Sequence, residues 1–194
     1  MLVYIGRFQP FHNGHLNQIR YGLEMNQKMI VVIGTVKTTA LNNPFQFDDV
    51  SNMIINSLTN SEIQRVTIAT IIDDSSNKVW QYNLNHIIRS IVNNKEEITL
   101  LGNEDDKSTT YLNNFPDWNV IYHYNKVGFH ASDVRDVFFN AKYTVWQNHE
   151  MEIMKPDLGH LVDMVPKGTF DILLDIVYND QDTYREMVKF YRSL

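Results

Sequence analysis

Two histidines in the segment His12-Asn13-Gly14-His15 carry the clearest chemical signal in the chain. They follow an apolar run and a turn that contains Arg7, and a helical pattern begins directly after them. The first turn of a helix presents unpaired N–H groups and the positive end of the helix dipole, which attract anions. His12 and His15 are three residues apart and share one side of that turn, while Gly14 lets a ligand approach the backbone. The pattern predicts a phosphate site.

A second segment, residues 129–135, has a similar character. We expect Ser132 to be the N-cap of a helix and Arg135 to lie in its first turn. An anion at this helix start would meet N–H groups, a hydroxyl and a guanidinium, whose fork binds two phosphate oxygens at once. By itself the segment fits an ordinary capped helix.

The elements that must position these residues are indicated by apolar runs that alternate with helical patterns. We expect strands at residues 2–5, 29–34, 66–72, 98–102 and 120–122, and helices at residues 16–25, 47–58, 79–92 and 108–115. This alternation predicts an α/β fold: a Rossmann-like five-stranded parallel sheet with helices on both faces and a C-terminal helical segment. We expect a single domain over residues 1–194, with a core of about 1–142 and a mostly helical part from about 143 to 194.

The carboxyl ends of the expected strands are the natural place for a ligand. Parallel sheets bind ligands beyond these ends, near the point where the strand order reverses. Gly6, Gly34 and Gly102 each stand at the end of an expected strand. We therefore expect them to meet at one edge, beside the two histidines.

The residues from Gly6 to His15 (GRFQPFHNGH) resemble the signature of the HxGH nucleotidylyltransferases, and in their full length that of the archaeal-type nicotinamide mononucleotide (NMN) adenylyltransferases. The chain is also similar to the adenylyltransferase domain of bifunctional NMN adenylyltransferase/Nudix hydrolases. Residues 129–135 resemble the second, ISSTxxR-like signature of this family, with His130-Ala131-Ser132 in place of Ser-Ser-Thr and with Arg135 kept. The resemblance implies adenylyl transfer from ATP to NMN by direct in-line attack, which gives NAD and pyrophosphate, with Mg²⁺ bound to the ATP.

The resemblance also implies roles for individual residues. His12 and His15 would bind the ATP phosphates, and Arg135 with Ser132 would bind the β- and γ-phosphates. The remaining phosphate and nucleotide contacts would come from Gly6, Arg7, Phe8, Gly14 and Gly102, with Gly102 near the adenine. Trp80 would stack on the nicotinamide ring, and Asp73 and Asn77 lie near it in the sequence. An aromatic face suits a cationic ring.

The chain departs from the family pattern at two positions where relatives carry arginines that help hold phosphate. It has Asn42 and Val50 there, and Lys37 is a nearby candidate for replacing the lost charge. Two alternatives therefore stay open. The chain could transfer a nucleotide to another acceptor, such as nicotinate mononucleotide or phosphopantetheine, or it could be a low-turnover regulatory module that binds NAD or ATP.

Composition narrows the class of protein further. The formal net charge of −6 argues against general nucleic-acid binding, and the absence of cysteine excludes disulfides and thiolate metal sites. No apolar run reaches membrane-spanning length and no signal-peptide pattern is present, so we expect a cytoplasmic protein without a membrane contact. We expect no metal site built by the protein itself, and a homo-oligomer is compatible with the resemblance.

Overall fold

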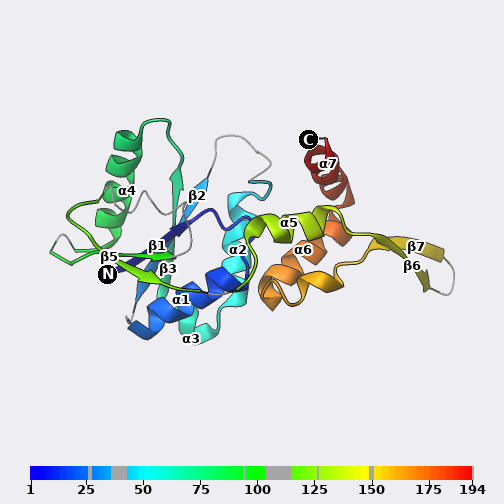
Figure 1. Cartoon of the computed structure of the whole chain (residues 1–194), viewed down its shortest axis with the longest axis horizontal. Coiled ribbons are helices and arrows are strands. Elements are labelled where there is room, and N and C mark those ends of the chain that lie inside the picture. Colours follow the sequence, from blue (N-terminus) through cyan, green and yellow to red (C-terminus); the bar gives the residue numbers. More distant parts are fainter. Residues whose placement is uncertain are drawn as a thin grey trace.

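A five-stranded parallel sheet lies in one half of the molecule, on the left in Figure 1, with the strand order β3-β2-β1-β4-β5. The computed structural model describes residues 1–25, 28–35, 43–93, 95–103, 115–125, 127–148 and 151–193. The strands are β1 (Leu2–Gly6), β2 (Met29–Thr35), β3 (Val66–Ile72), β4 (Thr99–Asn103) and β5 (Asn119–His123). The predicted α/β fold and its parallel sheet are confirmed.

The sheet is covered on both faces because side chains alternate along each strand. Leu2 and Tyr4 of β1 belong to one apolar cluster, and Val3 and Ile5 belong to the other. Central strand β2 contributes residues to both clusters and is almost wholly buried. A continuous apolar run is what such a doubly buried strand requires.

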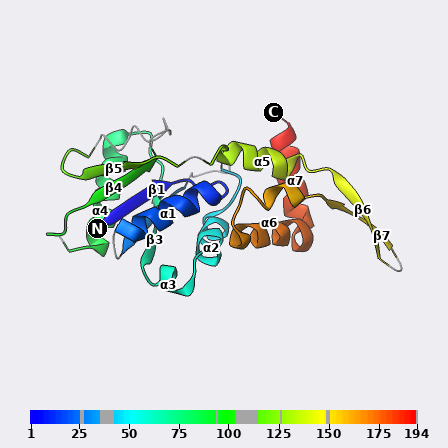
Figure 2. The same cartoon turned by 60° about the horizontal axis from the view of Figure 1, so that its bottom comes forward.

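The helices that cover the sheet are α1 (Asn13–Met25), α2 (Phe47–Ser57), the short α3 (Asn60–Ile63) and α4 (Asn77–Ile91). Helices α1 and α2 pack on the face that carries Leu2, and α4 packs on the opposite face through Leu84 and Ile88. Figures 1 and 2 show α4 and α1 on opposite sides of the sheet. The expected helix at residues 108–115 falls outside the described residues, apart from its last position. None of the helices described is both long and apolar enough to cross a membrane.

The chain after β5 forms helix α5 (Ala131–Phe139) and then a β-hairpin, with β6 (Tyr143–Asn148) antiparallel to β7 (Met151–Pro156). The expectation of mostly helical structure from about residue 143 is therefore wrong for residues 143–148 and 151–156. The run Tyr143-Thr144-Val145-Trp146 consists of aromatic and β-branched residues, which favour strands. The hairpin projects from the end of the molecule that is remote from the sheet (Figure 1).

Helical structure follows the hairpin, as expected, in the 3₁₀ turn η2 (Gly159–Leu161), α6 (Lys167–Asn179) and α7 (Gln181–Arg192). Helix α6 packs directly on the backbone of α2. A Cβ atom at Gly168 would lie 2.3 Å from the carbonyl carbon of Asn56, so only glycine allows this approach. The C-terminal helices thus form one body with the sheet-covering helix α2.

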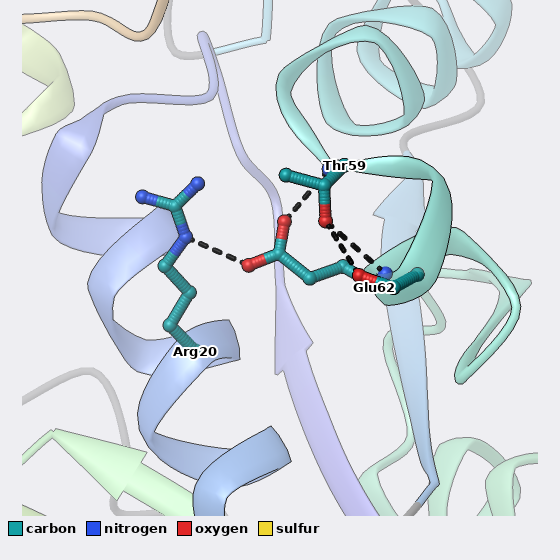
Figure 3. A network of polar contacts seen from close by, with 4 residues as sticks. Arg20, Thr59 and Glu62 are labelled. Atoms are coloured by element: carbon teal, nitrogen blue, oxygen red, sulfur yellow. Dashed lines mark hydrogen bonds and ion pairs between the residues drawn. The ribbon is translucent and has the colours of Figure 1, made fainter.

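A small polar network ties α1 to α3 (Figure 3). The Nε of Arg20 donates to Glu62 at 2.9 Å, and the second carboxylate oxygen of Glu62 accepts from the backbone N–H of Thr59 at 2.7 Å. Burial would raise the pKa of Glu62, but the hydrogen bonds from Thr59 and Arg20 outweigh it and lower the pKa. The network joins the capping box at the start of α3 to the neighbouring helix α1.

Candidate active site

A cavity of about 1070 Å³ lies at the carboxyl edge of the sheet. Gly6, Gly34 and Asn103 line it from the ends of β1, β2 and β4, and the starts of α1, α4 and α5 complete its walls. The strand order changes direction between β1 and β4, because the chain moves outward from β1 through β2 and β3 before it returns to β4. The cavity therefore occupies the switch point at which parallel sheets bind ligands.

Most of the residues predicted from the sequence line this one cavity. They are Gly6, Arg7, Phe8, His12, Gly14, His15, Asp73, Asn77, Trp80, Ser132 and Arg135. Gly102 is not among the described lining residues, since it is buried within β4 and its neighbour Asn103 faces the cavity instead. Of the positions where relatives carry arginines, Val50 is completely buried in the core, whereas Asn42 and the nearby Lys37 fall outside the described residues.

The two histidines cap the start of α1 with their own rings. His12 directly precedes the first helical residue rather than lying within the first turn, and its Nδ1 accepts from the N–H of Gly14 at 3.1 Å. The Nδ1 of His15 accepts from the N–H of His12 at 3.2 Å, and the rings stack with centroids 3.7 Å apart. Since each Nδ1 acts as an acceptor, the proton of each neutral ring is on Nε2. Both imidazoles thus offer an N–H donor to a ligand.

Gly14 is essential to this arrangement. A Cβ atom there would lie 2.7 Å from Val127 Cγ2 and 2.8 Å from the His12 ring. Asn125, which follows β5, donates its side-chain N–H to the carbonyl of Gly14. The chain after β5 therefore lies directly against the start of α1, and this contact closes one wall of the cavity.

The histidine pair is neutral in the folded protein at neutral pH. Burial, followed by the charge of His130, lowers the pKa of His12 to about 4, although Asp133 acts in the opposite direction. Burial and the neighbouring His12 also hold the pKa of His15 well below its usual value. Neutral rings donate hydrogen bonds to phosphate without the cost of burying two adjacent cations.

These lowered pKa values predict a loss of stability in acid. The unfolded chain takes up protons on both histidines below about pH 6.5, whereas folded His12 stays neutral until about pH 4, so stability falls between these values. When the pH falls from 7 to 5, the free energy of unfolding should decrease in both proteins. The decrease should be about 2 kcal/mol smaller for His12→Gln than for the wild type. Urea unfolding at both pH values measures this difference. His86→Gln, on the exposed face of α4, controls for the loss of a histidine, and equal losses in His12→Gln and the wild type would contradict the prediction.

Arg135 reaches the same cavity from α5. Its side chain is nine-tenths buried, and its Nη1 donates to the carbonyl of Gln9 in the turn after β1. The side-chain amide of Gln9 pairs with both backbone groups of Phe45, each at 2.9 Å. The Nε of Arg135 has no partner among the described residues. A buried guanidinium whose N–H group lacks an acceptor can donate that hydrogen bond to an anionic oxygen of a ligand.

The start of α5 differs from the sequence prediction. The N-cap is His130 rather than Ser132, because the carboxylate of Asp133 accepts from the backbone N–H of His130 at 2.6 Å and sets the first turn there. Ser132 is consequently the second helical residue and is exposed, while Arg135 begins the second turn. Both still line the cavity, together with His130.

The opposite end of the cavity is formed by the residues between β3 and the first turn of α4. The Nη2 of Arg7 forms an ion pair with Asp73 at 2.7 Å, and Asp74 and Asn77 lie beside it in the chain. Trp80 is partly buried: it packs edge-on against Phe115, with centroids 6.2 Å apart, and also lines the cavity. The indole therefore belongs to both the core and the site.

Sequence reasoning missed several lining residues. Gln9, His130 and Asn103 all stand inside or next to the quoted motifs, but none has a spacing that signals its role. The side-chain oxygen of Asn103 is buried and has no partner in the described part of the chain, so it is available to an N–H donor of a ligand. Within that same part, no group of three or more histidine, cysteine or acidic residues is arranged to hold a metal ion.

Known proteins resemble the chain over nearly its whole length. The nicotinamide/nicotinic acid mononucleotide adenylyltransferase of Acinetobacter baylyi is 25% identical over 194 residues, covering 99% of this chain and 93% of that protein. The nicotinamide-nucleotide adenylyltransferase of Sulfurisphaera tokodaii is 29% identical over 181 residues, covering 90% of each.

Solved structures agree with these relatives. A bifunctional NMN adenylyltransferase/ADP ribose pyrophosphatase from Francisella tularensis, crystallised with AMP and a manganese ion, matches with a TM-score of 0.74 and 28% identity. The match covers 97% of this chain but only 51% of that protein, so the chain corresponds to about half of it. The cytidylyltransferase-like family model matches residues 3–137, which include the sheet, both histidines and Arg135. The chain therefore belongs to the cytidylyltransferase-like family of HxGH proteins.

Proposed function

We propose that the protein transfers the adenylyl group of ATP to nicotinamide mononucleotide, forming NAD and pyrophosphate. The observation that carries this proposal is the convergence of His12, His15 and Arg135 on one cavity whose other end is formed by Trp80. The named activities of the Acinetobacter and Sulfurisphaera relatives support it. The proposal treats residues 1–194 as one domain, because α5 supplies Arg135 to a site otherwise built on the sheet.

The chemistry requires positioning and charge stabilisation rather than a covalent enzyme intermediate. A phosphate oxygen of NMN attacks the α-phosphorus of ATP in line, and the bond from that phosphorus to the oxygen bridging to the β-phosphate breaks. The bond electrons leave with pyrophosphate. The Nε2–H groups of His12 and His15 donate to the phosphate oxygens, and Arg135 offsets the charge that develops on the leaving group. Ser132 adds a hydroxyl beside Arg135 on the same helix.

Magnesium enters this reaction with its substrate. Because the described residues form no cluster suited to a metal ion, Mg²⁺ would be held mainly by ATP phosphate oxygens and water. A manganese ion accompanies AMP in the Francisella structure, which supports metal-assisted transfer. The metal neutralises phosphate charge, and the side chains orient the reacting groups.

Charge at the Trp80 end of the cavity favours nicotinamide over nicotinate. Asp73 and Asp74 both line this end, and Arg7 neutralises only Asp73. The pyridinium ring of NMN is cationic and its carboxamide is neutral, so the carboxylates and the indole face attract it. The additional carboxylate of nicotinate mononucleotide would be repelled by Asp74.

Product analysis after incubation with ATP, Mg²⁺ and NMN tests the proposal. We expect NAD and pyrophosphate in equal amounts, and a kcat/KM for NMN at least about tenfold above that for nicotinate mononucleotide. CTP in place of ATP and phosphopantetheine in place of NMN test the other nucleotidyl transfers. Calorimetric binding of NAD without any product from ATP and NMN would overturn the proposal and favour a regulatory module.

A further inference from the structure

Gln9 lies between the two parts of the proposed phosphate site. It belongs to the turn after β1 that leads into His12, it lines the cavity, and only 6% of its surface is exposed. Its backbone carbonyl accepts the hydrogen bond from Nη1 of Arg135, which comes from α5. The turn therefore connects the histidine pair at the start of α1 to the guanidinium on another helix.

The side chain of Gln9 holds this turn in place. Its Nε2 donates to the carbonyl of Phe45 and its Oε1 accepts from the N–H of Phe45, each at 2.9 Å. An amide that pairs with both backbone groups of one residue cannot rotate without breaking both bonds. Gln9 and Phe45 are both buried, so breaking these bonds would leave buried polar groups unpaired. The side chain of Gln9 thus restrains the direction of its own carbonyl.

Phe45 also reaches α5 through its ring. The ring packs against Phe138 with centroids 6.0 Å apart and against Phe139 with centroids 6.3 Å apart. These two residues follow Arg135 by three and four positions, so they share one side of α5 with it. Helix α5 is therefore joined to the Gln9 turn at two places, through the Phe45 ring and through the guanidinium.

The bond from Arg135 to Gln9 does not occupy the edge of the guanidinium that Nε and Nη2 form. An edge with two N–H groups is the part of an arginine that binds two phosphate oxygens side by side. The bond to Gln9 uses Nη1, whereas Nε is buried and has no partner among the described residues. Gln9 can consequently hold Arg135 while the N–H of Nε is kept for a ligand.

We infer that Gln9 is a positioning residue for the proposed adenylyl transfer. Its side-chain amide fixes its carbonyl, and the carbonyl fixes the guanidinium of Arg135 relative to His12 and His15. The inference rests on the proposed function, in which these donors must contact phosphates of the same ATP. It assigns to the Gln9 side chain an effect on the reaction that is exerted through Arg135.

The variant Gln9→Met tests this inference, because methionine has a similar volume but neither the donor nor the acceptor. We expect kcat/KM for ATP to fall about tenfold, since the carbonyl of residue 9 and the guanidinium that it holds become free to move. Ile88→Ala is the control for lost stability, because Ile88 is buried in α4 on the opposite face of the sheet and does not line the cavity. The control should lower the melting temperature at least as much as Gln9→Met and retain the wild-type kcat/KM.

A double-mutant cycle with Arg135→Ala separates positioning from a purely structural role. In the Arg135→Ala protein, Gln9→Met has no guanidinium to displace, so we expect it to change kcat/KM by less than about twofold. An equal loss with and without Arg135, or no loss in either protein, would overturn the inference. Gln9→Glu keeps the acceptor for the N–H of Phe45 and serves in the same cycle where Gln9→Met does not fold. It should lose about threefold in kcat/KM, again only when Arg135 is present.

The proposed function and the inference can fail separately. A wild-type protein that forms no NAD would reject the proposed function. Calorimetric titration with inorganic pyrophosphate then decides the inference, because Gln9→Met should bind pyrophosphate about tenfold more weakly than Ile88→Ala. Equal affinities of these two variants, or no pyrophosphate binding by the wild type, would overturn the inference.

Discussion

Replacing His15 by alanine is expected to lower kcat for NAD formation by about 10²–10³, the usual effect of removing one preorganised donor to a charged transition state. The Nδ1 of His15 is occupied by the N–H of His12, so only Nε2–H is available to the phosphates. The stacked ring of His12 supports His15 from one side, and the Phe8 ring contacts it edge-on with centroids 4.9 Å apart. This packing fixes the donor before the substrate arrives.

Steady-state rates with ATP and NMN measure the effect of His15→Ala. His86→Ala is the matched control, because His86 stacks on Tyr82 on the exposed face of α4, away from the cavity. We expect the control to keep the wild-type kcat. Turnover in His15→Ala within about threefold of the wild type would remove His15 from the mechanism.

Replacing Arg135 by lysine is expected to lower kcat/KM for ATP by about 10², although the positive charge is kept. An ammonium has no planar fork, so it cannot keep the bond to the carbonyl of Gln9 while it also contacts two phosphate oxygens. The shorter reach of lysine from α5 adds to the loss. Measurement of kcat and KM separately distinguishes the loss of transition-state contacts from weaker ATP binding.

Arg20→Lys is the matched control for the arginine substitution. Arg20 forms its ion pair with Glu62 between α1 and α3, and it does not line the cavity (Figure 3). The control is expected to change stability slightly and to leave kcat/KM unchanged. Equal kinetics in Arg135→Lys and Arg20→Lys would show that the fork of Arg135 serves only the fold.

The sheet could be predicted from the sequence because burial on two faces leaves a simple pattern. The run Met29-Ile30-Val31-Val32-Ile33 is apolar throughout, and such a run is typical of a strand that is covered on both sides. Once parallel strands were expected, the position of His12 and His15 near one edge followed from topology, whereas the place of Arg135 was implied by the family resemblance. The structure places all three on the same cavity.

The details that escaped prediction depend on contacts between distant segments. Nothing near Gln9 indicates that its amide pairs with Phe45 or that its carbonyl receives Arg135. The start of α5 was misplaced because Ser132 belongs to the residue types preferred at an N-cap, whereas the helix begins where the backbone N–H of His130 donates to the carboxylate of Asp133. The β6–β7 hairpin was missed because its short strands lie next to long helical patterns.

Gln9 forms hydrogen bonds with two segments that are far from it in the sequence. Phe45 lies 36 residues away from it and Arg135 lies 126 residues away, yet both depend on this one residue for a hydrogen-bond partner. Closing such long loops is entropically costly, and the cost is recovered only when all three segments meet. The side of the cavity that carries Arg135 is therefore completed only after α5 has been synthesised, because the carbonyl of Gln9 has no guanidinium to bind before then.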